Sequence, residues 1–185
     1  RPNAAERSLL TVFLLLLRTL GQRYIMNRKK SHLPPSKNAK QPTLLTLSSE
    51  RTGKSADFFI AGVGASAGGL EALKQLLSSL DPDTGIAFVL VQHLDPMHES
   101  MSAEILSRIT SIPVVEAKDR TRLEPDHVYV IPANYGLGIT QGILNLVPRT
   151  KVRGQPRVID SFLKELAEDR KNLAVGIVLS GTGND

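Results

Sequence analysis

The sequence predicts an α/β protein with a doubly wound, mostly parallel sheet flanked by helices. Three continuous apolar runs of strand length support this prediction, because a parallel strand that is buried on both faces needs apolar residues at nearly every position. These runs are Phe58–Val63, Ile86–Gln92 and Ala174–Ser180. Segments with helical periodicity lie between them, and strands that alternate with helices indicate crossover connections within one sheet.

Local signals predict the elements of the first half of this domain. After the strand at Phe58–Val63, leucines recur at helical spacing from Leu70 to Leu80, and Asp81-Pro82 ends that helix. The next strand is expected at Ile86–Gln92. It is followed by a helix near Glu99–Ile109 with an apolar face formed by Met101, Ile105, Leu106 and Ile109.

The second half contains short strands, a hairpin and one longer helix. Short strands are expected at Pro113–Ala117 and Val128–Ile131. A Gln141-Gly142 turn divides Gly136–Pro148 into the two strands of a hairpin. Val158–Arg170 has the apolar periodicity of an amphipathic helix, carried by Ile159, Phe162, Leu163 and Leu166.

Charge is distributed unevenly along the 185 residues. Residues 1–55 carry 11 Lys/Arg and 2 Asp/Glu, a net charge of +9, whereas the remainder carries 12 and 16, a net charge of −4. Residues 26–56 are rich in Pro, Ser, Lys and Asn and lack a sustained apolar period. We therefore expect a disordered basic tail or linker at residues 1–56 and a folded domain at residues 57–185. A solvated tail is favoured over one that binds nucleic acid or an anionic membrane.

Leu9–Leu17 is a strongly apolar stretch between Arg7 and Arg18. It is shorter than the roughly 20 residues that span a bilayer, so no stable membrane anchor is expected. The stretch is similar to the apolar part of a signal peptide, but no small-residue cleavage site follows it. The favoured alternative is a natural start at Met26. The chain has no Cys, which excludes disulfides and thiolate chemistry and fits a reducing compartment.

Ser66 lies in the glycine-rich segment Gly64–Gly69, which joins a predicted buried strand to a predicted helix. Such a turn can present a hydroxyl above the sheet, and the N–H groups of the helix that follows can stabilise an oxyanion. Taken alone, the segment fits three interpretations: a purely structural turn, a phosphate-binding loop, or a nucleophile.

His93 favours the nucleophile, because it directly follows the second apolar strand and imidazole is a suitable base for a serine hydroxyl. Asp185, in the segment SGTGND after the last strand, would complete a Ser-His-Asp set. All three residues follow strands, and sites in such sheets lie outside the carboxyl ends of the strands. His98 is more simply a solvated residue, while His127 begins a strand and His32 lies in the tail.

Two other site chemistries are disfavoured. His93, Asp95 and His98 could form a metal site, but their spacing matches no zinc motif. A nucleotide-binding protein that uses the two glycine-rich loops is the weakest hypothesis, since no Gly-Lys-Ser/Thr follows the glycine turn and no G-x-G-x-x-G is present.

Three motifs together resemble the catalytic domain of the chemotaxis protein-glutamate methylesterases. They are GASAGGLEAL with Ser66, QHLDP with His93, and LSGTGND with Asp185. The segment VVEAKDRTRLEPDHVYVIPAN resembles the linking region of the family. The run from Ile159 to Asp185 is most similar to methylesterase–methyltransferase fusions. The resemblance covers about Phe58–Asp185.

This resemblance implies that Ser66 is the nucleophile, His93 the general base and then acid, and Asp185 the carboxylate that orients the imidazole. It implies a cytoplasmic enzyme, without a cofactor, that demethylates glutamates on chemoreceptor cytoplasmic helices and releases methanol. Glutamine deamidation occurs in some members. A methyltransferase domain in the same parent chain would fit the fusion type, and no nucleic acid partner is implied.

The sequence departs from the family in four ways. Many members have Thr at the position of Ala67 and Met at that of Thr182, so a catalytically weak or inactive module for receptor docking or signalling is the alternative. Residues 1–55 are too short for a phosphoacceptor receiver domain and lack its acidic cluster. The family domain continues beyond the residue equivalent to Asp185, so we expect a C-terminally truncated domain whose sheet is incomplete at that end.

Overall fold

In the computed structural model, residues 58–65, 69–92, 103–132, 135–148 and 158–179 are described, together with Leu15 and Thr19. The elements in chain order are β1 (Phe59–Ala65), α2 (Leu70–Ser78), β2 (Ile86–Gln92), α3 (Ala103–Ser107), β3 (Val114–Glu116), β4 (Thr121–Arg122), β5 (His127–Val130), β6 (Tyr135–Thr140), β7 (Ile143–Pro148), α4 (Val158–Arg170), a 3₁₀ turn (Lys171–Leu173) and β8 (Ala174–Leu179). Leu15 and Thr19 are helical, and the Thr19 hydroxyl donates a 2.7 Å hydrogen bond to the Leu15 carbonyl.

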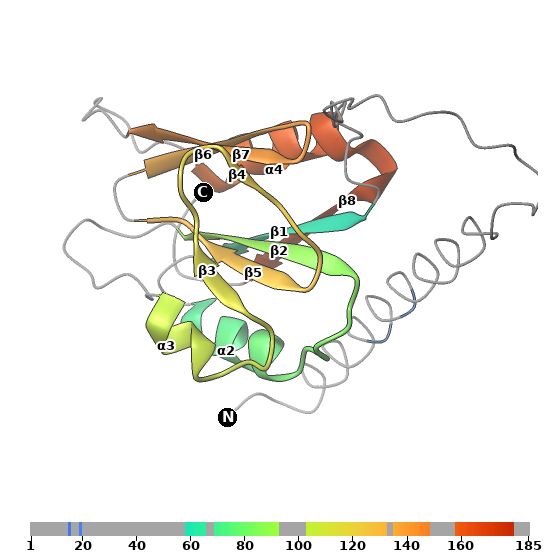
Figure 1. Ribbon diagram of the computed structural model, residues 1–185, viewed down its shortest axis with the longest axis vertical. Helices are drawn as coiled ribbons and strands as arrows, with labels where there is room; N and C mark the ends of the chain where they lie inside the picture. The colour runs from blue at the N-terminus through green and yellow to red at the C-terminus, as the bar shows by residue number, and fades with distance from the viewer. Residues whose placement is uncertain are drawn as a thin grey trace, which may run out of the picture.

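The central sheet has the strand order β3-β5-β2-β1-β8, and each neighbouring pair is parallel. Helices lie on both of its faces, which confirms the predicted α/β class. Figure 1 shows α2 and α3 on one side of this sheet, and α4 with the β6–β7 hairpin on the other. A second, antiparallel sheet has the order β4-β7-β6. Its short strand β4 was not predicted.

One face of the central sheet is covered by α2 and α3. The apolar period of α2 buries Leu73, Leu76 and Leu77 completely, and α3 contributes Leu106. After α2, the backbone N–H of Ser79 donates to the Leu76 carbonyl, which closes the helix just before the predicted Asp81-Pro82 stop. The strand side chains in this core are Ala61, Val63, Ile86, Phe88, Leu90, Val128, Val130 and Ile177.

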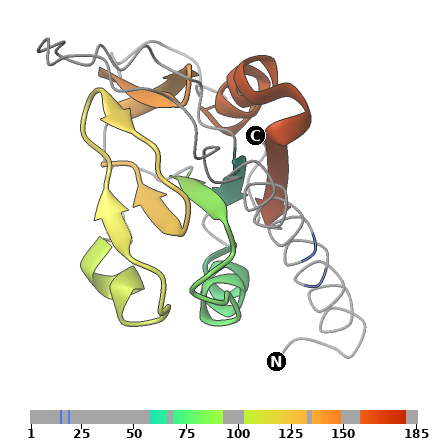
Figure 2. The ribbon, with the colours of Figure 1, turned by 45° about the vertical axis from the view of Figure 1, so that its right-hand side comes forward.

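The other face is covered by α4 and by the hairpin. Alternate strand residues such as Ile60, Val89 and Tyr129 pack there against Phe162 and Leu166 of α4. Burial of both faces accounts for the continuous apolar runs of β1 and β2. Figure 2 shows the same three layers after rotation, with α4 in red on the side of the sheet opposite to α2 in green.

Helix α4 crosses β1 antiparallel and at close range. At the amino end of β1, the buried Arg170 donates a 2.9 Å hydrogen bond from Nη2 to the Phe58 carbonyl. Toward the carboxyl end, Ile159 packs on Gly64. Glycine in a strand often marks a place where another element approaches closely, and Gly64 has this role. It belongs to β1 and not to the turn predicted at Gly64–Gly69.

The predicted hairpin is confirmed, and α4 anchors it. Gln141 and Gly142 have φ values of 52° and 70°, as expected for the left-handed residues of a two-residue hairpin loop. Both of their N–H groups donate to the Asp169 carboxylate, the Gly142 bond at 3.0 Å. The Glu165 carboxylate accepts from the Ile139 N–H at 3.3 Å. Helix and hairpin therefore form one unit above the sheet.

Helix α3 ends two residues before the predicted end at Ile109. Residues 93–102 lie outside the described part of the chain, and α3 covers Ala103–Ser107 where a helix over Glu99–Ile109 was expected. Leu106 is buried as predicted, but Ile105 is 43% exposed, so its assignment to the apolar face was wrong. Ala103, Leu106 and Ile109 pack on the core. Ile105 therefore lies on the opposite, outward-facing side of this segment.

Candidate active site

Three strands end together at one edge of the central sheet. In the parallel ladders, Ala65 of β1 is paired with Gln92 of β2 on one side and with Leu179 of β8 on the other. Neighbouring strands lie about 4.7–4.9 Å apart. The three segments predicted to carry the site therefore leave the sheet from adjacent strands. The placement of the three candidates after neighbouring strands of one sheet therefore agrees with a common site at this edge.

The predicted residues Ser66, His93 and Asp185 themselves lie outside the described part of the chain, as do Asp95, His98, Ala67 and Thr182. The described residues fix where the chain departs toward them. Ser66 directly follows Ala65, and His93 directly follows Gln92, so two of the three candidates come one residue after paired positions. Asp185 comes six residues after Leu179.

A helix begins immediately after the Ser66 segment. The buried Gly69 is the N-cap of α2 and makes no side-chain capping hydrogen bond. The first N–H groups of a helix lack intrahelical partners and carry a partial positive charge. The strand predicted before Ser66 and the helix predicted after it are therefore confirmed. This arrangement can stabilise either an oxyanion or a bound phosphate.

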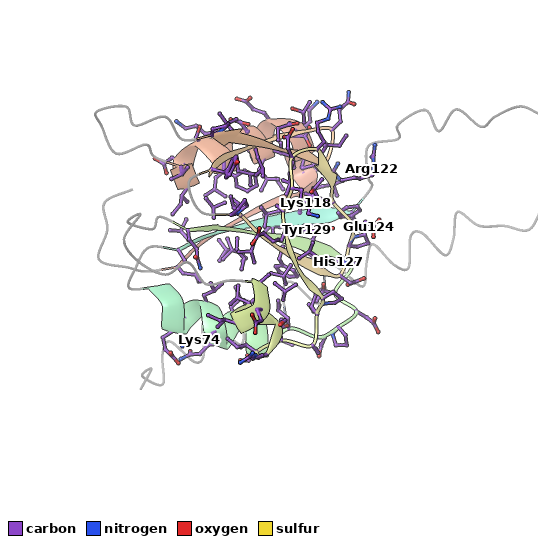
Figure 3. All side chains as sticks on the ribbon, turned by 60° about the vertical axis from the view of Figure 1, so that its left-hand side comes forward. Lys74, Lys118, Arg122, Glu124, His127 and Tyr129 are labelled. Carbon is purple, nitrogen blue, oxygen red and sulfur yellow. The ribbon has the colours of Figure 1, made fainter. Side chains whose placement is uncertain are left out.

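His127, the only histidine in the described part of the chain, lies away from this edge. It is the first residue of β5 and is paired with Ala87 near the start of β2, at the amino end of the sheet. Its Nδ1 lies 2.9 Å from the Pro125 carbonyl, and its ring stacks on Tyr129 with centroids 6.0 Å apart. Figure 3 shows His127, Tyr129 and Glu124 grouped on this part of the molecule. The prediction that His127 is not near a strand carboxyl end is confirmed.

The Tyr129 side chain, which stacks on His127, is held by burial and by a hydrogen bond from the backbone. Burial raises the pKa of its phenol, and its oxygen accepts a 2.9 Å hydrogen bond from the Glu124 N–H.

Within the described ranges, no three His, Asp or Glu residues form a group that could hold a metal ion. The described part of the chain likewise contains no helix long and apolar enough to cross a membrane.

One contact near the proposed site, between Ile159 and Gly64, was not predicted from the sequence. Ile159, in the first turn of α4, is buried against Gly64, two residues before Ser66. The available signal was the pair of glycines Gly62 and Gly64, at alternate positions of an otherwise apolar strand. That signal indicates a close approach but does not identify the element that approaches.

Comparison with known proteins agrees with this architecture. The model of the CheB methylesterase family matches residues 61–185, which is more than half of the chain. The protein therefore belongs to the CheB methylesterase family.

Relatives and a solved structure give the same result. The protein-glutamate methylesterase/protein-glutamine glutaminase of Yersinia pestis is 30% identical over 171 residues, covering 87% of this chain and 46% of the relative. The protein of that name from Escherichia coli K12 is 30% identical over 166 residues, covering 84% and 44%. The chain thus spans less than half the length of these relatives. The crystal structure of the Thermotoga maritima CheB methylesterase catalytic domain superposes with a TM-score of 0.57 at 26% identity, covering 69% of this chain and 70% of that chain.

Proposed function

We propose that the protein is a serine hydrolase that demethylates methylated glutamates on the cytoplasmic helices of chemoreceptors. The observation that carries this proposal is the register of β2, β1 and β8, in which Gln92, Ala65 and Leu179 are paired side by side. Three segments that carry Ser66, His93 and Asp185 leave the sheet from that edge. Membership of the CheB methylesterase family supports the choice of an ester as substrate.

In the proposed reaction, the Ser66 hydroxyl attacks the carbonyl carbon of the glutamate methyl ester while His93 takes the hydroxyl proton. Unpaired N–H groups at the start of α2 stabilise the negative charge on the ester oxygen. When the tetrahedral intermediate collapses, the bond to the methoxy group breaks. His93 returns the proton, and methanol leaves. The product of this half-reaction is an acyl-enzyme on Ser66.

Water completes the cycle. His93 removes a proton from the attacking water, the ester bond to Ser66 breaks, and the serine oxygen regains its proton from the imidazolium. A glutamate carboxylate is released. Asp185 holds the imidazole in the tautomer that can accept the serine proton. An amide can follow the same path with ammonia as leaving group, so glutamine deamidation is a second proposed activity.

The wider setting is also a proposal. We place the enzyme in the cytoplasm, with residues 1–56 as a basic segment before a catalytic domain at residues 57–185. A methyltransferase domain in the same parent chain would be a functional partner, because it catalyses the opposite reaction.

The decisive experiment for the proposed activity measures methanol release from methylated receptor by the full-length protein. Wild type should release methanol and Ser66→Ala should not, whereas equal release by both would refute the assignment.

A second candidate function is a binding module with a methylesterase fold and little or no catalysis. The substitutions at Ala67 and Thr182 motivate it, because Ala67 directly follows Ser66 and Thr182 lies three positions before Asp185 in the sequence. A serine-directed fluorophosphonate separates the two functions. An active enzyme is labelled at Ser66, whereas a binding module stays unlabelled yet retains its affinity for receptor.

A further inference from the structure

Packing at the end of β1 differs from packing in its middle. A Cβ atom added to Gly64 would lie 3.3 Å from Cδ1 and 3.4 Å from Cβ of Ile159, and closer still to the branch methyl Cγ2. Ile159 is only 4% exposed and lies in the first turn of α4. The Ile159 side chain thus fills the space above Gly64, next to the segment that carries Ser66.

Gly62, two residues earlier, provides a direct contrast. A Cβ atom added there would lie 2.8 Å from Cδ2 of Leu163, 3.0 Å from Cδ2 of Leu166 and 3.0 Å from Cε1 of Phe162. Two of these atoms are the methyl ends of leucine side chains, which can change rotamer, and the third is an edge atom of the buried Phe162 ring. The Cγ2 atom of Ile159 is attached to Cβ, and a β-branched residue in a helix has one strongly preferred χ1 rotamer. The contact at Gly64 can therefore yield only if α4 or the end of β1 moves.

We infer that Ile159 is a positioning residue for the nucleophile: it fixes the distance between the first turn of α4 and the end of β1, and thereby the place of Ser66 relative to His93. This inference rests on the proposed function. Its physical basis is the sensitivity of catalysis to geometry, since a displacement of about 1 Å can cost on the order of 100-fold in rate. The rest of the helix contact contributes to stability but is not expected to set this distance.

Adding a methyl group at position 64, and then shortening the facing side chain at position 159, tests the inference in the full-length protein. Gly64→Ala should lower kcat by about 10- to 100-fold with KM changed less than about twofold. Adding Ile159→Ala should restore most of kcat, because the double variant removes Cγ2 and relieves the overlap. Gly62→Ala is the matched control and should retain the wild-type kcat. Wild-type kcat in a folded Gly64→Ala variant, or no recovery in the double variant, would overturn the inference.

A second pair of variants covers the case in which Gly64→Ala does not fold. Ile159→Val keeps the branched Cβ and should keep kcat within about threefold of wild type, whereas Ile159→Ala should lower it about tenfold. Equal kcat in these two variants would refute the role of Ile159. Labelling of Ser66 by a fluorophosphonate provides a readout independent of the substrate. If wild type is labelled but releases no methanol, the proposed function fails. The labelling rates of wild type, Ile159→Val and Ile159→Ala, compared with one another, still test the inference. If wild-type Ser66 is not labelled, both are refuted.

Discussion

Ala65 and Gln92 are paired neighbours at the ends of two parallel strands, and the next residue after each is a member of the proposed catalytic set. This register explains how Ser66 and His93, which are 27 positions apart in the chain, start from adjacent points. Leu179 is paired with the same Ala65 from the other side, so β1 is the centre of the arrangement. The nucleophile segment therefore leaves the sheet between the segments of the base and the carboxylate.

Asp185→Asn is predicted to lower kcat of the full-length protein on the order of 10²- to 10⁴-fold, because an amide no longer favours the imidazole tautomer that accepts the serine proton. KM should change little, since this carboxylate does not contact the ester. Methanol release at several substrate concentrations measures both constants. Asp83→Asn is the control, because Asp83 is exposed in the turn before β2, at the amino end of the sheet. Wild-type kcat for Asp185→Asn would remove this residue from the triad.

Tyr129→Phe is predicted to reduce the free energy of unfolding at pH 7 by about 0.5–1.5 kcal/mol, because the Glu124 N–H loses its hydrogen-bond acceptor. Burial raises the pKa of Tyr129 in the folded protein above its unfolded value of 10.0. Stability from the neutral phenol is therefore fully present below about pH 10 and is lost as the pH rises through the folded pKa.

Urea unfolding between pH 7 and pH 11 measures both effects. The wild type should lose stability above pH 10 more steeply than Tyr129→Phe does. Tyr135→Phe serves as the control, because Tyr135 is 37% exposed at the start of β6. Parallel stability curves for wild type and Tyr129→Phe would contradict the prediction.

Asp169→Ala is predicted to destabilise the fold by about 1.5–3 kcal/mol, since its carboxylate accepts hydrogen bonds from the N–H groups of both Gln141 and Gly142. The loss should be concentrated in the hairpin, whose amide protons should exchange faster than those of β1 and β2. Glu168→Ala is a matched control on the exposed side of the same helix turn. Equal stability of the two variants would show that α4 does not anchor the hairpin.

Much of the fold was predictable because its signals are local. Continuous apolar runs predicted β1, β2 and β8, and α4 begins and ends at the predicted Val158 and Arg170. The two-residue strand β4 has no such signal, since it is defined by pairing with β7 about 20 residues later. The role of Gly64 was equally hidden, because it depends on Ile159, which lies 95 positions away in the chain.

The candidate site shows the same division between local and long-range information. Residue types and their places after strands were sufficient to select Ser66, His93 and Asp185. The proposed convergence of these three residues depends on β1 lying between β2 and β8, a strand order that no local pattern encodes. Distances among the three side chains lie beyond the described residues, so the triad remains a prediction.

The rate at which a fluorophosphonate modifies Ser66 in the full-length protein tests the central claim most directly. Mass spectrometry identifies the modified residue, and His93→Gln is compared with His127→Gln, which changes a histidine at the opposite end of the sheet. We expect rapid labelling of Ser66 in wild type and in His127→Gln, and labelling slower by about 100-fold or more in His93→Gln. Equal labelling rates in all three proteins, or no labelling of Ser66 in wild type, would contradict the proposed triad.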